Sequence, residues 1–451
     1  MKHNNSSNSI SSSNESNKNT KHTLLLALGS IPLMMTLGNS MLIPVLPEMA
    51  RKLNVTSLRV SMLITVYAVA AIILIPIAGY LSDRFGRKAV IVPSLIIAVI
   101  GAGISAAGAW LLADQAAYWT IIGGRLLQGV GAAGAFPIVI PLVGDLYTQE
   151  EEVSRNLGIV ETYNTFGKVL SPILGAALGM VLWYLPLLSI PVFFLISLLL
   201  VIFFVSVPRR KQKADVSFKE FLSELKTVLG KNGRWLYSIF AMGGICMFAI
   251  FGTLFYLSET LESKHHLHGV IKGGVLAIPL AFLCVSSYVG GKIIGKNKAR
   301  MKWLGFSGLA LLTICFTLIS FFKNIYVEIG LFALGSAGIG LTLPCLDSLI
   351  TRGIEKKERG TITSLYSSMR FVGVSLGPPI VSLLLHRGHS LLFIVMSLLS
   401  AAGGLLMLFA VKPREDEADT DEGRVNDPQG QQQTKDSERR MPGIRKKAGY
   451  R

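Results

Sequence analysis

The sequence has few charged residues. Asp, Glu, Lys and Arg make up only 16% of its 451 residues, whereas a soluble domain usually carries about 25%. Hydrophobic residues account for 51% of the chain, and its mean hydropathy is +0.52. These values exclude an ordinary soluble domain, so we predict an all-α membrane protein.

The sequence also lacks the marks of several functional classes. Its four cysteines (Cys246, Cys284, Cys315 and Cys345) have no paired spacing, so we expect buried free thiols and no metal site. It has no phosphate-binding loop of the Walker type, and no span holds a cluster of His and acid residues. We therefore expect no cofactor and no enzyme activity, although a membrane-embedded enzyme or receptor remains an alternative.

Long apolar runs fill most of the chain. A spanning helix needs roughly 20 apolar residues, which predicts twelve spans: 23–46, 58–81, 89–112, 117–143, 155–181, 184–207, 235–257, 269–295, 303–322, 326–351, 360–386 and 389–411. The predicted domains are a disordered tail (1–22), a six-helix bundle (23–207), a linker with an interfacial helix at Phe218 to Leu229 (208–234), a second six-helix bundle (235–411) and a second disordered tail (412–451).

The net charge of +17 would suit a nucleic-acid-binding protein, but the distribution of the cations argues against one. They concentrate in the loops after spans 6, 8 and 10, and the alternate loops carry fewer. Short cationic loops stay in the cytosol. We therefore predict a multi-pass protein of the cell membrane with both termini and the linker in the cytosol, and no nucleic-acid partner.

The loop between spans 2 and 3 carries the most specific motif. It resembles the signature loop of the major facilitator superfamily, Gly-x-Leu-x-Asp-Arg-x-Gly-Arg-Lys, through Gly79, Leu81, Asp83, Arg84, Gly86, Arg87 and Lys88. Asp83 is placed to cap a helix end or to pair with an arginine. The resemblance implies two six-helix bundles that alternate access to a site between them, with this loop and Asp145 latching the inner gate.

Span 4 resembles a second motif of the family, Arg-x-x-x-Gly-x-Gly, through Arg125, Gly129 and Gly131. Gln128 shares a helical face with Arg125. A buried guanidinium must find an anion, carbonyls or water; the alternative is that Arg125 extends to the outer headgroups. Asn39 of span 1, where relatives often carry an aspartate, lies at a similar depth and can hydrogen-bond to Arg125.

Span 5 resembles the family's antiporter motif through Gly158, Gly167, Ser171, Pro172 and Gly175, with Ser171 and Ala176 in place of glycines. Gly167, Ser171, Gly175 and Gly179 form a stripe of small residues that permits close helix packing. The resemblance implies that this stripe packs against the opposite bundle, closes the outer side and marks an exporter. Ordinary packing is the alternative. Span 11 repeats the pattern at Gly373 and Gly377.

One face of span 5 also carries Glu161, Asn164 and Lys168. Glu161 is the only carboxylate well inside a predicted span, so we expect it to carry a proton and Arg125 to tune it; a structural salt bridge with Lys168 is the alternative. We expect Asn39, Gln128, Asn164, Lys168 and Arg370 to contact the substrate. Three deep cations against one acid favour an anionic or zwitterionic substrate, unless carbonyls and water satisfy the cations.

Taken with the drug:proton antiporters that the motifs resemble, these features predict a monomeric, proton-coupled exporter of a small organic compound, a drug or a metabolite. The resemblance extends over residues 23–411 and includes carriers that confer multidrug resistance. An importer or facilitator on the same fold is the alternative.

Overall fold

In the computed structural model, the described residues are 5–147, 149–206, 218–294, 297–354 and 359–411, and they are helical almost throughout. The predicted tail 412–451 and most of the linker before Phe218 lie outside them. The elements are α1 (Asn5–Ser40), η1 (Ile43–Val45), α2 (Leu46–Lys52), α3 (Ser57–Phe85), α4 (Arg87–Leu111), α5 (Asp114–Ala135), α6 (Val139–Leu146), α7 (Glu150–Val181), α8 (Leu185–Phe204), α9 (Phe218–Ser263), α10 (Gly269–Ile294), α11 (Lys298–Ile319), α12 (Ile325–Gly353), α13 (Arg359–Leu385) and α14 (His389–Ala410).

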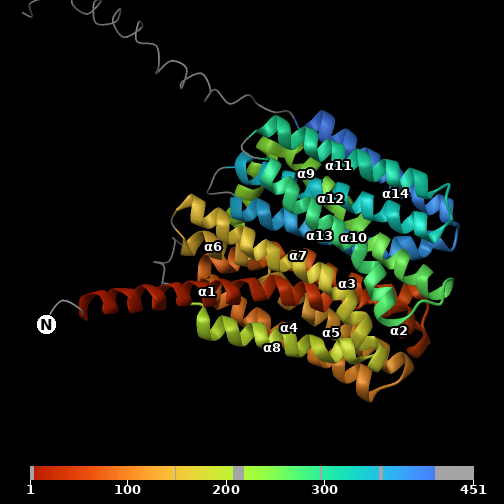
Figure 1. The fold of residues 1–451 in the computed structure, drawn as a ribbon, viewed down its shortest axis with the longest axis horizontal. Coiled ribbons are helices and arrows are strands. Elements are labelled where there is room, and N and C mark those ends of the chain that lie inside the picture. Colours follow the sequence, from red (N-terminus) through yellow and green to blue (C-terminus); the bar gives the residue numbers. More distant parts are fainter. Residues whose placement is uncertain (1–4, 148, 207–217, 295–296, 355–358, 412–451) are drawn as a thin grey trace, which may run out of the picture. The chain divides into compact units, whose positions relative to one another are not determined.

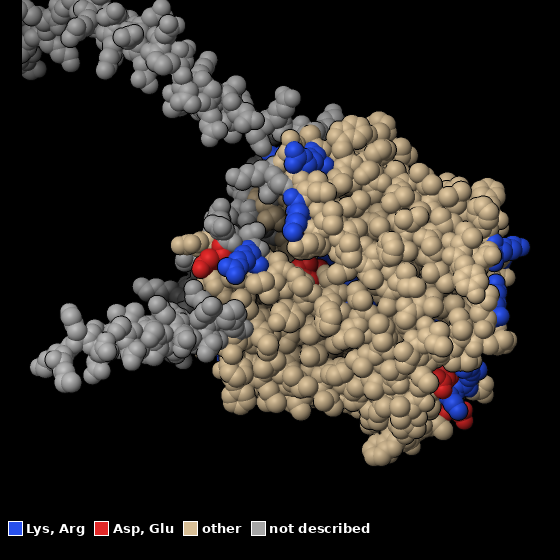
Figure 2. All heavy atoms as spheres, in the orientation of Figure 1, with Lys and Arg blue, Asp and Glu red and all other residues tan. Residues whose placement is uncertain are grey.

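These helices confirm the all-α membrane fold. Figure 1 shows α1 to α8 as one group and α9 to α14 as a second group beside it. Among the described residues, eleven helices are long and apolar enough to cross a membrane. The helix α7 is the predicted fifth span, and its polar residues lower its hydropathy. In Figure 2 the middle of the visible face is almost free of charged side chains, which gather towards two opposite ends, as lipid contact requires.

Three helices differ from the sequence prediction. Span 4 is divided into α5 and α6 at Phe136–Ile138, because Pro137 lacks the N–H of a continuous helix. The linker residues from Phe218 are helical as predicted, but they continue into span 7 as the single helix α9, without a separate interfacial helix. The backbone of α1 begins at Asn5, within the tail predicted to be disordered, since extending a formed helix needs no new nucleus.

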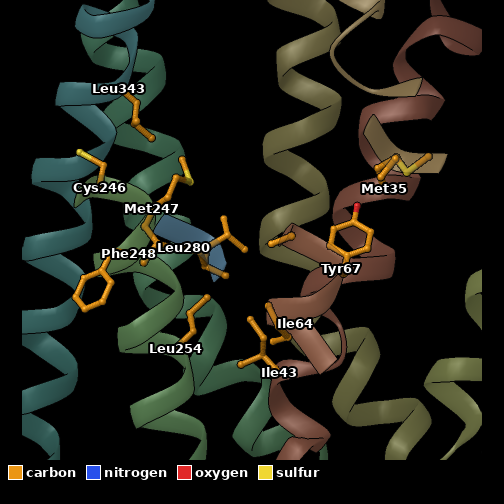
Figure 3. Packing of buried hydrophobic residues seen from close by; sticks show 14 of the residues in the cluster. Met35, Ile43, Ile64, Tyr67, Cys246, Met247, Phe248, Leu254, Leu280 and Leu343 are labelled. Atoms are coloured by element: carbon orange, nitrogen blue, oxygen red, sulfur yellow. The ribbon is translucent and has the colours of Figure 1, made fainter. Parts of the chain in front are cut away.

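Two pairs of long helices make most of the contacts between the two groups, α3 with α13 and α7 with α10. The hydroxyl of Thr65 on α3 donates to the carbonyl oxygen of Ser375 on α13 at 2.8 Å. One apolar core includes residues of both groups. Figure 3 shows Ile43 and Ile64 of the first group on the opposite side of the interface from Leu254 and Leu280 of the second. A site between the groups therefore lies between these two pairs of helices.

The inner end of the bundles is the end that holds the α3–α4 junction, and the outer end is the end that holds α2. These names follow the orientation that the positive-inside rule predicts.

Candidate functional site

Polar residues on α7 form the first half of the candidate site. Lys168 Nζ lies 4.0 Å from Glu161 Oε1. The amide of Asn164 donates to the same Glu161 oxygen at 3.0 Å, and its oxygen accepts from the hydroxyl of Thr36 on α1 at 2.6 Å. The predicted shared face of Glu161, Asn164 and Lys168 is therefore present.

The second half of the site comes from α12 and α13. Arg370 Nη1 lies 3.8 Å from Asp347 Oδ1, and its guanidinium lies over the ring of Tyr366 at 5.7 Å. Asp347, Arg370, Glu161 and Lys168 all lie within electrostatic reach of one another. The two groups of helices thus contribute two acids and two cations to one cluster, which we call the four-charge cluster.

This cluster corrects the charge count made from the sequence. Glu161 is not the only acid available to the deep cations, because Asp347 is paired with Arg370. The spacing along α12 places Asp347 only about 9 Å from the inner end, so it does not count as a deep acid from the sequence. The packing of α12 beside α13 brings it to Arg370. Charge balance therefore no longer requires an anionic substrate.

Arg125 lies apart from that cluster. It is fully buried, so the alternative in which it extends to the headgroups is wrong. Its guanidinium donates to the carbonyl oxygens of Leu63 (2.9 Å) and Gly38 (3.4 Å) and to the side-chain oxygens of Gln128 (2.8 Å) and Asn39 (2.6 Å), and it lies over the ring of Tyr67 (4.5 Å).

These contacts hold α1, α3 and α5 together. Asn39 and Gln128 are buried and are occupied by Arg125, so the structure does not offer them to a substrate, contrary to the sequence prediction. Carbonyls and amides satisfy Arg125, as in the alternative considered for the deep cations. None of these contacts of Arg125 is with Glu161, so they do not support the prediction that Arg125 modulates the proton affinity of Glu161.

At the inner end, Arg87 connects three helices. Gly86 alone separates α3 from α4, and its φ of 99° is a conformation that favours glycine. Arg87 pairs with Asp83 at 2.6 Å and with Asp145 of α6 at 3.0 Å, and it donates to Ser82 Oγ at 2.7 Å. Of the two roles predicted for Asp83, pairing with an arginine is therefore the one observed.

The neighbouring loop residues extend these contacts. Lys88 donates to the carbonyl oxygens of Ile202 (3.0 Å) and Val205 (2.7 Å), where a cation suits the C-terminus of α8. Arg84 lies over the ring of Phe85. Gly79 is helical, and a Cβ there would lie 3.1 Å from Ser364 Oγ of α13. A small pocket lined by Asp83, Arg87 and residues 360, 361 and 364 of α13 lies beside this contact.

We predict that Asp83→Asn slows transport more than it weakens substrate binding. The lost pair with Arg87 is half exposed, so it contributes about 1 kcal/mol, or roughly fivefold in turnover. Turnover in vesicles and binding to purified protein would be measured separately. Asp114→Asn, at the exposed start of α5, is the control; equal turnover of both variants would rule out the latch.

At the outer end, buried charges that the sequence prediction missed connect the two groups. Lys272 of α10 donates to Glu262 Oε2 of α9 at 2.7 Å and to the carbonyl oxygen of Pro44 in η1 at 2.6 Å. Arg51 of α2 also pairs with Glu262. Ser258 of α9 donates to the carbonyl oxygen of Ile43 at 2.9 Å. A lysine and a glutamate near the ends of apolar helices are the signal that could have indicated this network.

The small-residue stripe of α7 is not where the resemblance placed it. A Cβ at Gly167 would approach the Leu33 carbonyl oxygen, and one at Gly175 would overlap the Met41 backbone; both partners belong to the same group of helices. Gly179 likewise faces Val45 of η1, whereas a Cβ at Gly158 would meet nothing within 4 Å.

The stripe of α13 behaves in the same way, because Gly373 and Gly377 face the backbone of α9. Each stripe therefore joins two helices of its own group. The outer contact between the groups uses another face of α7: a Cβ at Gly273 of α10 would lie 2.5 Å from the Pro172 carbonyl oxygen and 2.8 Å from Ala176 Cβ. Ser171 is buried and donates to the carbonyl oxygen of Lys168.

Comparison with known proteins gives consistent matches over most of the chain. A family model described as Major Facilitator Superfamily matches residues 28–378 and 323–443. The bacillibactin exporter of Bacillus subtilis is 50% identical over 402 residues, which are 89% of this chain and 99% of that protein. The class C tetracycline resistance protein of Escherichia coli is 22% identical over 383 residues, covering 80% of this chain and 89% of that one.

Two solved structures share the fold. A bacterial homologue of the human lysosomal transporter Spinster, inward-facing and unoccupied, aligns with a TM-score of 0.70 at 15% identity, covering 87% of this chain and 97% of its own. The human organic anion transporter MFSD10 aligns with a TM-score of 0.64 at 17% identity, covering 86% of this chain and 99% of its own.

Proposed function

Because this chain belongs to the Major Facilitator Superfamily, we propose that it is a secondary active transporter that exports a small organic compound in exchange for protons. The observation that carries the proposal is the 50% identity with the bacillibactin exporter over nearly the full length of both chains. Bacillibactin or a closely related molecule is therefore the first substrate to test.

Coupling to protons is supported by Glu161. Its side chain is 55% exposed, although it lies about 16 Å along α7. The outer ends of the two groups are joined by contacts of Lys272, Glu262 and Ser258, so water would reach Glu161 from the inner side. An acid in that position can release a proton to the cytosol and bind one when the outer side opens.

The test is transport in membrane vesicles of both orientations, each with an imposed pH gradient. Inverted vesicles with an acidic lumen should accumulate bacillibactin, and collapsing the gradient should stop the accumulation. Uphill accumulation by right-side-out vesicles would instead establish the importer. Competition of tetracycline with bacillibactin would indicate that the protein exports a broader range of drugs. We expect the carrier to act as a monomer in the cell membrane, with both termini in the cytosol.

A further inference from the structure

The four-charge cluster differs in its distances from two short ion pairs at the ends of the described helices. Arg87–Asp83 and Lys272–Glu262 close at 2.6 and 2.7 Å, whereas Lys168–Glu161 and Arg370–Asp347 stand at 4.0 and 3.8 Å. The last two lie at the outer limit for an ion pair, beyond hydrogen-bond distance. A carboxylate held this loosely can lose its charge without breaking a hydrogen bond to its cation.

Exposure separates the acids of the cluster from its cations. The side chains of Glu161 and Asp347 are 55% and 47% exposed, while those of Lys168 and Arg370 are 16% and 23% exposed. The two acids are therefore more accessible to water than the two cations. Asp347 resembles Glu161 in each respect: exposure, distance to its cation and membership of the cluster.

The internal repeat relates the two halves of the cluster. Arg370 lies three residues before Gly373, the first glycine of the α13 stripe, as Asn164 lies three residues before Gly167 in α7. Asn164 donates to Glu161, and Arg370 pairs with Asp347. Equivalent positions of the two halves, Asn164 and Arg370, thus each contact an acid, and the site has one acid from each half although the two acids lie on helices that are not equivalent.

Charge balance makes the two acids interdependent. With all four groups ionised, the cluster sums to zero. Protonating either acid leaves one surplus positive charge, which Arg370 cannot relieve because it does not lose its proton. The remaining carboxylate then interacts with both cations, so a change of charge on one acid changes the electrostatic surroundings of the other.

We propose that Asp347 is a second proton-carrying residue of the transporter and that Arg370 is its positioning residue. The groups that face Asp347 are Glu161 and Lys168 of α7, Arg370 and Tyr366 of α13, Cys246 of α9 and Cys345 of α12. In each cycle a proton from the water outside binds a carboxylate oxygen and later returns to water in the cytosol. No bond of the substrate changes. This inference rests on the proposed proton-coupled export.

The test counts protons in liposomes that contain the full-length chain and a trapped pH indicator. Bacillibactin transport and proton movement are recorded together for wild type, Asp347→Asn, Glu161→Gln and the control Asp114→Asn. Removing one of two proton sites should lower the protons moved per substrate by about half in Asp347→Asn. Asp114→Asn should match the wild type.

A merely structural ion pair would lower the amount of folded protein and leave this ratio and the pH profile unchanged. Arg370→Lys keeps the positive charge, so it should keep the number of protons moved per substrate. Because an ammonium group differs in geometry from a guanidinium, the variant should shift the pH at half-maximal transport. If Asp347→Asn moves as many protons per substrate as the wild type, Asp347 carries no proton. This inference would then be wrong, while the proposed proton-coupled export would stand. If the wild type moves no protons with bacillibactin, the proposed function fails with it.

Discussion

Glu161→Gln is expected to lower uphill export by about tenfold at a gradient of one pH unit, while the protein still folds and still binds its substrate. Each proton that crosses down a gradient of one pH unit contributes about 1.4 kcal/mol, enough for about tenfold accumulation of the substrate. Glutamine keeps the shape of the side chain, and its carbonyl oxygen can still accept the hydrogen bond from Asn164. It cannot carry a proton, so only the second proposed proton site, Asp347, would remain and accumulation should fall by the factor that one proton supplies.

The measurement is accumulation of labelled bacillibactin in inverted vesicles, followed by exchange of labelled for unlabelled compound without a gradient. Exchange should persist in Glu161→Gln, because it needs alternating access but no net proton movement. Glu161→Asp keeps a carboxyl group and serves as the matched control, and it should accumulate more substrate than the glutamine variant. Full uphill transport by the glutamine variant would show that the proton is carried elsewhere.

The fold and the first half of the site could be predicted from the sequence because their signals are local. Apolar runs of membrane length predicted the helices, and counting residues along two helices placed Asn39 beside Arg125, where the structure has a 2.6 Å hydrogen bond. The spacing of Glu161 and Lys168 within α7 likewise placed them on one face. In each case the distance follows from helix geometry.

The second half of the site depends on which helices are neighbours, and the sequence pattern does not contain that information. Asp347 and Arg370 belong to different helices, and only the packing of α12 beside α13 brings them together. The same limit explains the α7 stripe. Spacing shows that a helix backbone approaches Gly175, but the partner could have been any helix. The equivalent stripe in α13, which faces α9, indicates packing within each group.

Gly273→Leu is expected to prevent closure of the outer side, whereas Gly274→Leu should have little effect. A Cβ at Gly273 would lie 2.5 Å from a backbone oxygen of α7, so any larger side chain forces α10 away from α7. A Cβ at Gly274 would meet nothing within 4 Å. Both substitutions remove a glycine from the same helix, so the change in helix propensity is matched, and the difference between them measures contact with the opposite group of helices.

Separating α10 from α7 should also weaken the neighbouring outer contacts, since Lys272 reaches the Pro44 carbonyl oxygen only while the groups are close. A loss of about 1–3 kcal/mol would shift the balance towards the outward-open state by roughly 5- to 150-fold. The measurement is the rate at which a membrane-impermeant thiol reagent labels a cysteine introduced at Ala177, with Cys284 replaced by serine. Labelling should rise and export should fall in Gly273→Leu. Equal labelling of the Gly273 and Gly274 variants would mean that this α7–α10 contact does not close the outer side.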